Sequence, residues 1–167
     1  MSLLAQRASK PSPNQPFLRI CGILILGLIY KNQESRIKNR ARHIALVDWA
    51  DVVVVVPATA NIIGKIANGI CDDLLSTILC AAWPLIKSGA ALLAPAMNNN
   101  MWDNPAVQRN VKTVKQMGFQ LIGPVKGRLA CGTEAIGRMA EPQDIIKSIE
   151  NIATKIKRES SREDTKS

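Results

Sequence analysis

The stretch ADVVVVVPA, residues 50–58, constrains the fold of this chain more than any other segment. It contains five valines in succession, and β-branched side chains favour extended backbone over helix. A strand with one face in water alternates apolar and polar residues, whereas a strand buried on both faces is apolar throughout, as this run is. Such strands belong to parallel sheets that are covered by helices. The run therefore predicts a central strand of an α/β fold.

Beyond this run, helical and extended patterns alternate along the chain. Apolar spacing of three and four residues, with capping, glycine or proline signals, predicts helices at 44–51, 60–69, 72–83, 105–118 and 142–157. Short apolar runs predict strands at 90–96 and 119–124, and residues 125–139 are expected to form a glycine-rich loop. Strands that alternate with helices form βαβ units. We therefore expect a single-domain α/β protein with a parallel sheet and helices on both faces.

An apolar run near the amino end, FLRICGILILGLIY at residues 17–30, has more than one interpretation. It is interrupted by Arg19, and it is shorter than the roughly 20 residues that a helix needs to span a bilayer. It resembles the apolar part of a signal peptide, but the polar residues after it offer no small-residue cleavage site. A buried strand or helix, a targeting or membrane segment, and a non-native or misread amino end all remain open.

The net charge of +9 is concentrated at the two ends of the chain. Residues 1–42 contain eight Lys or Arg and one acidic residue, and residues 154–167 contain five and three. Residues 43–153 contain nine of each sign. A nucleic-acid-binding domain carries its basic residues on a folded face, so the charge indicates solvated ends and we expect no nucleic-acid partner.

The four cysteines, Cys21, Cys71, Cys80 and Cys131, form no C-x-x-C pair, and His43 is the only histidine. A structural zinc site would therefore lack a ligand set, and we expect no metal. Cys71 and Cys80 fall in an apolar helical pattern and are expected to be core thiols. This cysteine usage fits a reducing cytoplasm.

Three loops follow the three expected strands: PATAN at 57–61, PAMNNNMW at 95–102, and residues 125–139. In open α/β sheets, ligands bind beyond the carboxyl ends of the strands. The three loops should therefore contribute to one site. The chain contains neither the G-x-G-x-x-G pattern of dinucleotide-binding folds nor a Walker loop, so neither NAD nor ATP has a fingerprint here.

Each loop has a chemical and a purely structural interpretation. Thr59 and Asn61 could meet a polar or anionic ligand at a helix amino end, or Thr59 could simply cap that helix. Met101 and Trp102 could cover an apolar ring, or Trp102 could pin its loop. Cys131 could be an accessible proton donor or nucleophile, or an ordinary surface thiol.

His43 precedes a short expected helix that leads into the first strand. A lone histidine is more often structural than catalytic, yet its unperturbed pKa near neutrality suits proton transfer. We expect it to enter the fold close to the three loops.

Three motifs carry a resemblance to a known family: HIALVDWADVVVVVPATANIIGKIANGICDDLLST, APAMNNNMWDNPAVQRN and ACGTEAIGRMAEP. Together, from about residue 43 to about residue 149, they closely resemble the flavin-dependent cysteine decarboxylases, above all the phosphopantothenoylcysteine decarboxylases of coenzyme A biosynthesis. The resemblance implies a flavodoxin-like fold that binds FMN and assembles as a homotrimer or a multiple of trimers, with the flavin at a subunit interface.

The resemblance also implies roles for individual residues. The implied reaction is the decarboxylation of 4′-phosphopantothenoylcysteine to 4′-phosphopantetheine, in which oxidation of the thiol provides an electron sink for the carbanion left by CO₂. His43 and Cys131 are the implied catalytic residues, and Cys131 is the proton donor. The implied flavin-binding positions are Thr59, Ala60, Asn61, Ile62 and Ala96. The implied substrate-binding positions are Asn98, which would hold the carboxylate, and Ala130, Gly132, Arg138 and Met139.

The amino end departs from the family pattern. Members of the family begin with a strand and a glycine-containing loop that holds the FMN phosphate, and no such loop is evident in residues 1–42. We therefore divide the chain into a divergent basic segment at 1–42, a decarboxylase-like domain at 43–153 and a charged tail at 154–167. Two alternatives to the enzyme remain: a non-catalytic regulatory subunit of the halotolerance-protein type, and an inactive truncated member of the family.

Overall fold

Four parallel strands form the central sheet of the computed structural model, which describes residues 20–24, 41–128 and 134–163. In order across the sheet they are β1 (Ile20–Leu24), β2 (Val52–Ala58), β3 (Ala91–Pro95) and β4 (Gln120–Leu121). The valine run forms β2, which pairs with β1 on one side and β3 on the other. This confirms the expected parallel α/β sheet.

The strand β1 comes from the ambiguous apolar run near the amino end. It pairs in parallel with β2 from Ile20 opposite Val52 to Leu24 opposite Val56. The strand interpretation of the run is thus confirmed for residues 20–24, and the rest of the run lies outside the described residues. None of the helices in the described part of the chain is long and apolar enough to cross a membrane.

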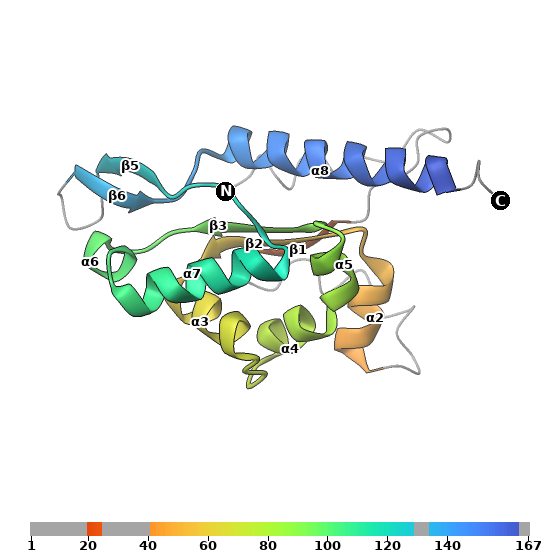
Figure 1. Cartoon of the computed structure of the whole chain (residues 1–167), viewed down its shortest axis with the longest axis horizontal. Coiled ribbons are helices and arrows are strands. Elements are labelled where there is room, and N and C mark those ends of the chain that lie inside the picture. The colour runs from red at the N-terminus through yellow and green to blue at the C-terminus, as the bar shows by residue number, and fades with distance from the viewer. Residues whose placement is uncertain (1–19, 25–40, 129–133, 164–167) are drawn as a thin grey trace.

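Helices cover both faces of the sheet, as expected (Figure 1). The helices are α2 (Arg42–Trp49), α3 (Ala60–Asn68), α4 (Leu74–Ala81), α5 (Trp83–Lys87), α6 (Asn99–Trp102), α7 (Pro105–Met117) and α8 (Pro142–Glu163). In Figure 1, α8 is the one helix of the described residues over one face, while α2 to α5 and α7 lie over the other. The helix α8 continues beyond residue 154, where the charged tail was expected to begin, as far as Glu163.

The valines of β2 divide between two buried clusters because successive side chains of a strand point to opposite faces. Val53 and Val55 pack with residues of α3, α4 and α7, whereas Val52 and Val54 pack with residues of α8. All four are at most 4% exposed. Burial on both faces explains why the run has no polar position.

The segment 125–139, expected to be a loop, forms two antiparallel strands instead, β5 (Val125–Arg128) and β6 (Glu134–Arg138). The glycines in this segment suggested a loop, but glycine also occurs in strands where another group approaches closely. A Cβ on Gly127 would lie 3.0 Å from Cδ of Arg138, so Gly127 makes room for the side chain of the facing strand.

Candidate functional site

The carboxyl ends of β1, β2 and β3 meet at one edge of the sheet, because the three strands are parallel. The Ala96 amide donates a hydrogen bond to the Ala58 carbonyl at 3.1 Å, which joins the loop after β3 to the end of β2. Ala58 is fully buried and Ala96 is partly buried. The loops after β2 and β3 therefore lie side by side at this edge, where they were expected to contribute to one site.

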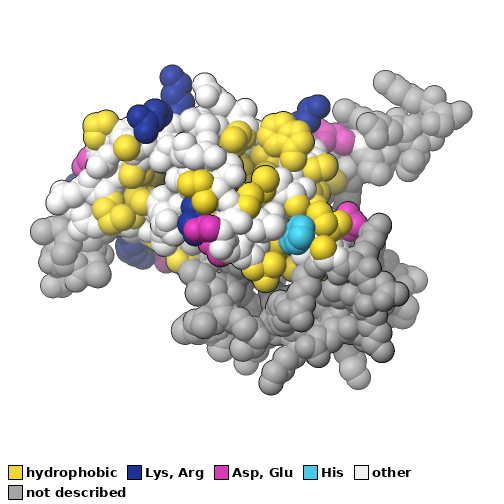
Figure 2. All heavy atoms as spheres, turned by 90° about the horizontal axis from the view of Figure 1, so that it is seen from below, with side chains coloured by type: hydrophobic (Ala, Val, Ile, Leu, Met, Phe, Trp, Pro, Cys, Tyr) yellow, Lys and Arg dark blue, Asp and Glu magenta, His cyan; other side chains and the backbone are white. Residues whose placement is uncertain are grey.

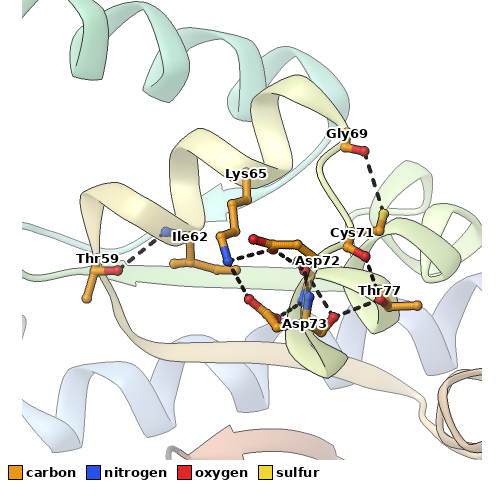
Figure 3. Close-up of polar contacts among 9 residues, drawn as sticks. Thr59, Ile62, Lys65, Gly69, Cys71, Asp72, Asp73 and Thr77 are labelled. Atoms are coloured by element: carbon orange, nitrogen blue, oxygen red, sulfur yellow. Dashed lines mark hydrogen bonds and ion pairs between the residues drawn. The ribbon is translucent and has the colours of Figure 1, made fainter.

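The helix α3 begins at this edge with Thr59 as its N-cap (Figure 3). The Thr59 hydroxyl accepts a hydrogen bond from the Ile62 amide at 3.4 Å, so its capping role is confirmed. The first amides of a helix have no partner within the helix, so those of Ala60 and Asn61 are available at this edge as donors for a ligand. Thr59 and Asn61 are exposed.

Asn98 is the N-cap of the short helix α6 and is exposed. Its side-chain oxygen accepts a hydrogen bond from the Asn100 amide at 2.8 Å, which sets the orientation of the side-chain amide. The Asn99 side chain donates to that of Asn100 at 3.1 Å. The three asparagines therefore build one tight turn, and Asn98 starts it.

Two of the apolar side chains in this loop anchor it and a third is open to solvent. Met97 and Trp102 are partly buried and pack against the core cluster on the α3 and α7 side of the sheet. The Gln108 side chain donates to the Trp102 carbonyl at 2.5 Å. Met101, by contrast, is 47% exposed. Trp102 thus pins the loop, and Met101 is the residue that could cover an apolar ligand.

The strand β6 reaches the same edge through the main chain. The Met97 amide donates a hydrogen bond to the Gly137 carbonyl at 2.9 Å, and α6 packs against β6. Figure 1 shows α6 directly beneath the β5–β6 hairpin. The third segment named from the sequence therefore joins the other two.

Arg138 and Met139, the two expected substrate-binding residues that follow Gly137, contact other residues of the chain. The Arg138 guanidinium forms an ion pair with the Glu141 carboxylate, and Met139 packs against the core cluster beneath α8. Ala130, Cys131 and Gly132 lie outside the described residues. Their expected roles stay predictions.

His43 is not brought to this edge within one chain. It lies near the start of α2, the helix that precedes β2. Figure 1 shows α2 and α6 at opposite ends of the long axis of the molecule. The expectation that His43 enters the fold near the three loops is therefore not met within a single chain, because α2 ends beside the amino end of β2 and, with 8 residues, is too short to reach back along the 7 residues of the strand to its carboxyl end.

The far end of α3 contains a charged corner that the sequence did not indicate (Figure 3). The Lys65 ammonium lies 2.6 Å from the Asp72 carboxylate and 2.5 Å from the Asp73 carboxylate. Hydrogen bonds from Lys65 and from the Ser76 amide lower the pKa of Asp73 to about 2. Asp73 and Ser76 also form the capping box of α4, so the corner joins α3 to α4.

Cys71 and Cys80, expected to be core thiols, are both exposed. The helix α4 buries Ile78 and Leu79 on its inner face, which leaves Cys80 outside. The neighbouring Cys80 thiol raises the pKa of Cys71, which disfavours its thiolate, and the Cys71 thiol donates a hydrogen bond to the Gly69 carbonyl at 3.6 Å. Among the described residues, no three His, Cys, Asp or Glu side chains are grouped to hold a metal ion.

From the sequence, Gly137 was expected only to make its loop flexible, and its main-chain bond to Met97 was not anticipated. Its signal was an isolated glycine between strand-forming residues, a position that often marks a β-bulge or a close approach of two backbones. The surrounding glycines masked this signal, because they made the whole segment look like a loop.

Comparison with known proteins identifies the family to which this chain belongs. The family model described as Flavoprotein matches residues 11–154. Over 108 residues the chain is 50% identical to the coenzyme A biosynthesis bifunctional protein CoaBC of Bacillus subtilis, covering 65% of this chain and 25% of that protein. It is 44% identical over 115 residues to phosphopantothenoylcysteine decarboxylase of Arabidopsis thaliana, covering 69% and 54%. The chain thus spans about half or less of the length of these relatives.

Solved structures give the same result. A variant of PPC decarboxylase complexed with pantothenoylaminoethenethiol is 42% identical and has a TM-score of 0.65, covering 71% of this chain and 64% of that one. The FMN binding protein AtHal3 is 43% identical with a TM-score of 0.59, covering 69% and 60%. The expected flavodoxin-like architecture is confirmed, and the chain belongs to the Flavoprotein family.

Proposed function

We propose that this protein is an FMN-dependent decarboxylase that converts 4′-phosphopantothenoylcysteine to 4′-phosphopantetheine. One observation supports this most strongly. The pair of main-chain bonds from Ala96 to Ala58 and from Met97 to Gly137 gathers three separate segments at one sheet edge. The resemblance had assigned flavin and substrate roles to these segments, and the relatives named above are phosphopantothenoylcysteine decarboxylases.

The residues at this edge suit the ring system of a flavin, which presents carbonyl oxygens and ring nitrogens along its edge. Thr59, Asn61 and the first amides of α3 supply neutral hydrogen-bond donors there, and Ala60 and Ala96 are small enough for a flat ring to approach. We propose that these residues and Ile62 hold the flavin. When bound, FMN would supply a reversible acceptor for two electrons.

Asn98 is proposed to bind the carboxylate of the substrate. An amide can donate to a carboxylate without adding charge, so it orients the group that leaves as CO₂ without stabilising it as an ion pair would. The Asn100 bond fixes the side chain before the substrate arrives. Cys131 is proposed to donate the proton to the product, with Ala130, Gly132, Arg138 and Met139 around the substrate.

We further propose that the active form is a homotrimer in the cytoplasm and that His43 serves the site of a neighbouring subunit. The exposed apolar residues Ile44, Ile70 and Leu74 are 39–47% exposed and belong to α2 or to the segment at the start of α4, two helices that pack together. In Figure 2 the histidine side chain lies among hydrophobic side chains. An apolar surface of this kind is typical of a contact between subunits.

Flavin binding is the first test of the proposal. The purified protein is incubated with FMN and desalted, and its visible absorption spectrum is recorded. Retained flavin bands, followed by release of CO₂ from 4′-phosphopantothenoylcysteine, are the expected results. A folded protein that stays colourless would instead support the inactive alternative. Flavin retained without decarboxylation would favour the regulatory subunit.

Asn98→Asp tests the assigned substrate contact. The new carboxylate should repel that of the substrate, so turnover should fall by about 100-fold or more while flavin absorbance is unchanged. Asn98→Ser is a matched control for the charge, because it keeps a polar N-cap and should lose less activity. Turnover of the aspartate variant at the wild-type rate would exclude the proposed role of Asn98.

A further inference from the structure

The strand β6 contains one residue more than its partner at a single position. Val125 pairs with Arg138 and Lys126 pairs with Ile136, so Gly137 is the extra residue of a β-bulge. A bulge breaks the ladder locally and redirects the backbone groups of the extra residue. The carbonyl of Gly137 is thereby available to a partner outside the hairpin.

That partner is the loop that carries Asn98. The Gly137 carbonyl accepts a hydrogen bond from the Met97 amide at 2.9 Å, one residue before Asn98. The preceding amide, that of Ala96, donates to Ala58 on the other side. The approach to Asn98 is therefore held from two directions, by the end of β2 and by the bulge in β6.

The bulge needs glycine and is braced by its neighbours. Gly137 is buried and has φ +153°, a backbone conformation that side-chain-bearing residues rarely adopt. The stem of Arg138 crosses Gly127, where an added Cβ would lie 3.0 Å from it. The ion pair between Arg138 and Glu141 holds the other end of the same side chain.

We propose that Gly137 is a positioning residue for substrate recognition: its bulge fixes Met97, and through it Asn98, relative to the hairpin, so that Asn98 meets the substrate carboxylate in one defined place. The inference rests on the proposed function, in which Asn98 binds that carboxylate. Gly137 itself need not touch the substrate. Its effect should therefore depend on whether the ligand carries the carboxylate.

The test compares two ligands that differ in this group. One is an unreactive substrate analogue with a hydroxyl in place of the cysteine thiol, which keeps the carboxylate. The other is the product, 4′-phosphopantetheine, which lacks the carboxylate. Isothermal titration calorimetry on the FMN-loaded full chain gives both dissociation constants for the wild type, for Gly137→Ala and for the matched control Gly69→Ala. Gly69 also has positive φ, but it lies at the far end of α3.

Gly137→Ala should weaken binding of the analogue by about tenfold, the usual effect of losing a well-placed hydrogen bond, and leave product binding within about twofold. Gly69→Ala should change neither constant. Equal weakening of both ligands by Gly137→Ala would mean general loosening of the site and would overturn the positioning role. No change in either constant would overturn it as well.

Hydrogen exchange at the Met97 amide is measured by NMR, and its wild-type part requires neither activity nor any variant. The wild-type amide should be protected, and in Gly137→Ala its exchange should be faster than in Gly69→Ala. An unprotected Met97 amide in the wild type would overturn the proposal. If the wild type shows this protection but binds neither FMN nor the two ligands, the link between the segments stands and the proposed function fails.

Discussion

Gly118 occupies a position in which no other residue fits. It ends α7 with φ +114°, and a Cβ at this position would lie 2.4 Å from the Ile86 carbonyl oxygen. Both the backbone conformation and the contact with a neighbouring main chain therefore require glycine. The residue joins α7 to the end of α5, which is packed in the core.

Gly118→Ala should lower the free energy of unfolding by more than about 2 kcal/mol, because it combines backbone strain with a clash against main chain that cannot move freely. Gly69→Ala is a suitable control, since no atom lies within 4 Å of its Cβ position. It should cost about 1 kcal/mol from positive φ alone. Urea unfolding followed by circular dichroism measures both, and equal costs would contradict the clash.

Asp73 should make the free energy of unfolding of the protein depend on pH in the acidic range. Its pKa in the folded chain is lowered to about 2 from the ordinary value of 3.8, chiefly by Lys65. A carboxyl with a depressed folded pKa stabilises the fold above its unfolded pKa and loses this effect as pH falls through the folded value. The stabilisation by ionised Asp73 should therefore be complete above pH 3.8 and should be lost as the pH falls from 3.8 to about 2.

The comparison with Asp73→Asn isolates this contribution. Asparagine keeps an N-cap for α4 but carries no charge for Lys65. The urea midpoint of the wild type should exceed that of the variant near neutral pH, by a modest amount because the pair is exposed, and the two should converge at the acid end. If the difference between the two urea midpoints did not change with pH, the ion pair between Asp73 and Lys65 could not be its cause.

At the scale of elements, α8 alone covers one face of the sheet within the described residues. Its apolar residues Ile145, Ile149 and Ile152 pack against Val52, Val54 and Leu92, and each is at most 8% exposed. No residue of α8 belongs to the proposed site. Only Glu141, just before the helix, contacts a proposed site residue, through its ion pair with Arg138. The role of α8 is to bury the apolar residues on one face of the central sheet, the same side on which the β5–β6 hairpin lies (Figure 1).

Ile152→Ala should cost about 2–5 kcal/mol of stability, because it leaves a cavity beneath the helix. The neighbouring Asn151 is exposed, and Asn151→Ala should stay within about 0.5 kcal/mol of the wild type. Thermal or urea unfolding of both variants checks the pair. Similar stabilities would mean that α8 is not firmly packed on the sheet.

At the scale of the whole molecule, the separation of His43 from Asn98 has a direct consequence. If His43 acts in the site of a neighbour, each complete site combines two chains. Subunits that lack His43 and subunits that lack Asn98 should then complement each other, because a mixed interface can contain both intact residues.

Co-expression of His43→Asn and Asn98→Asp chains should therefore restore decarboxylation well above the low activity expected of each variant alone. With random assembly of equal amounts, half of the chains supply each intact residue, so about a quarter of the sites should be complete. Co-expression of Asn98→Asp with Asn98→Ala should remain inactive. Mixed oligomers without activity would mean that the two residues do not act together across an interface.

Much of the fold could be predicted from local signals. The valine run indicated a strand buried on both faces, Thr59 indicated the start of α3, and Gly118 indicated the end of α7. These features depend on the chemistry of a few neighbouring residues, which the sequence displays directly. Cys80 was wrongly placed in the core because an apolar helix shows its periodicity in sequence but not which residues face outward at its margin.

The sequence by itself determined the strands β2, β3 and β4, the main helices between them and the loops after β2 and β3, since hydrophobic periodicity and capping act over a few residues. Only the tertiary structure decided that β5 and β6 pair, that Gly137 bonds to Met97, and that α2, which carries His43, lies at the opposite end of the molecule from α6, which Asn98 caps. The physical reason is the range of the interactions. Pairing between strands and the packing of helices on a sheet join residues far apart in the chain, and no local pattern specifies their partners.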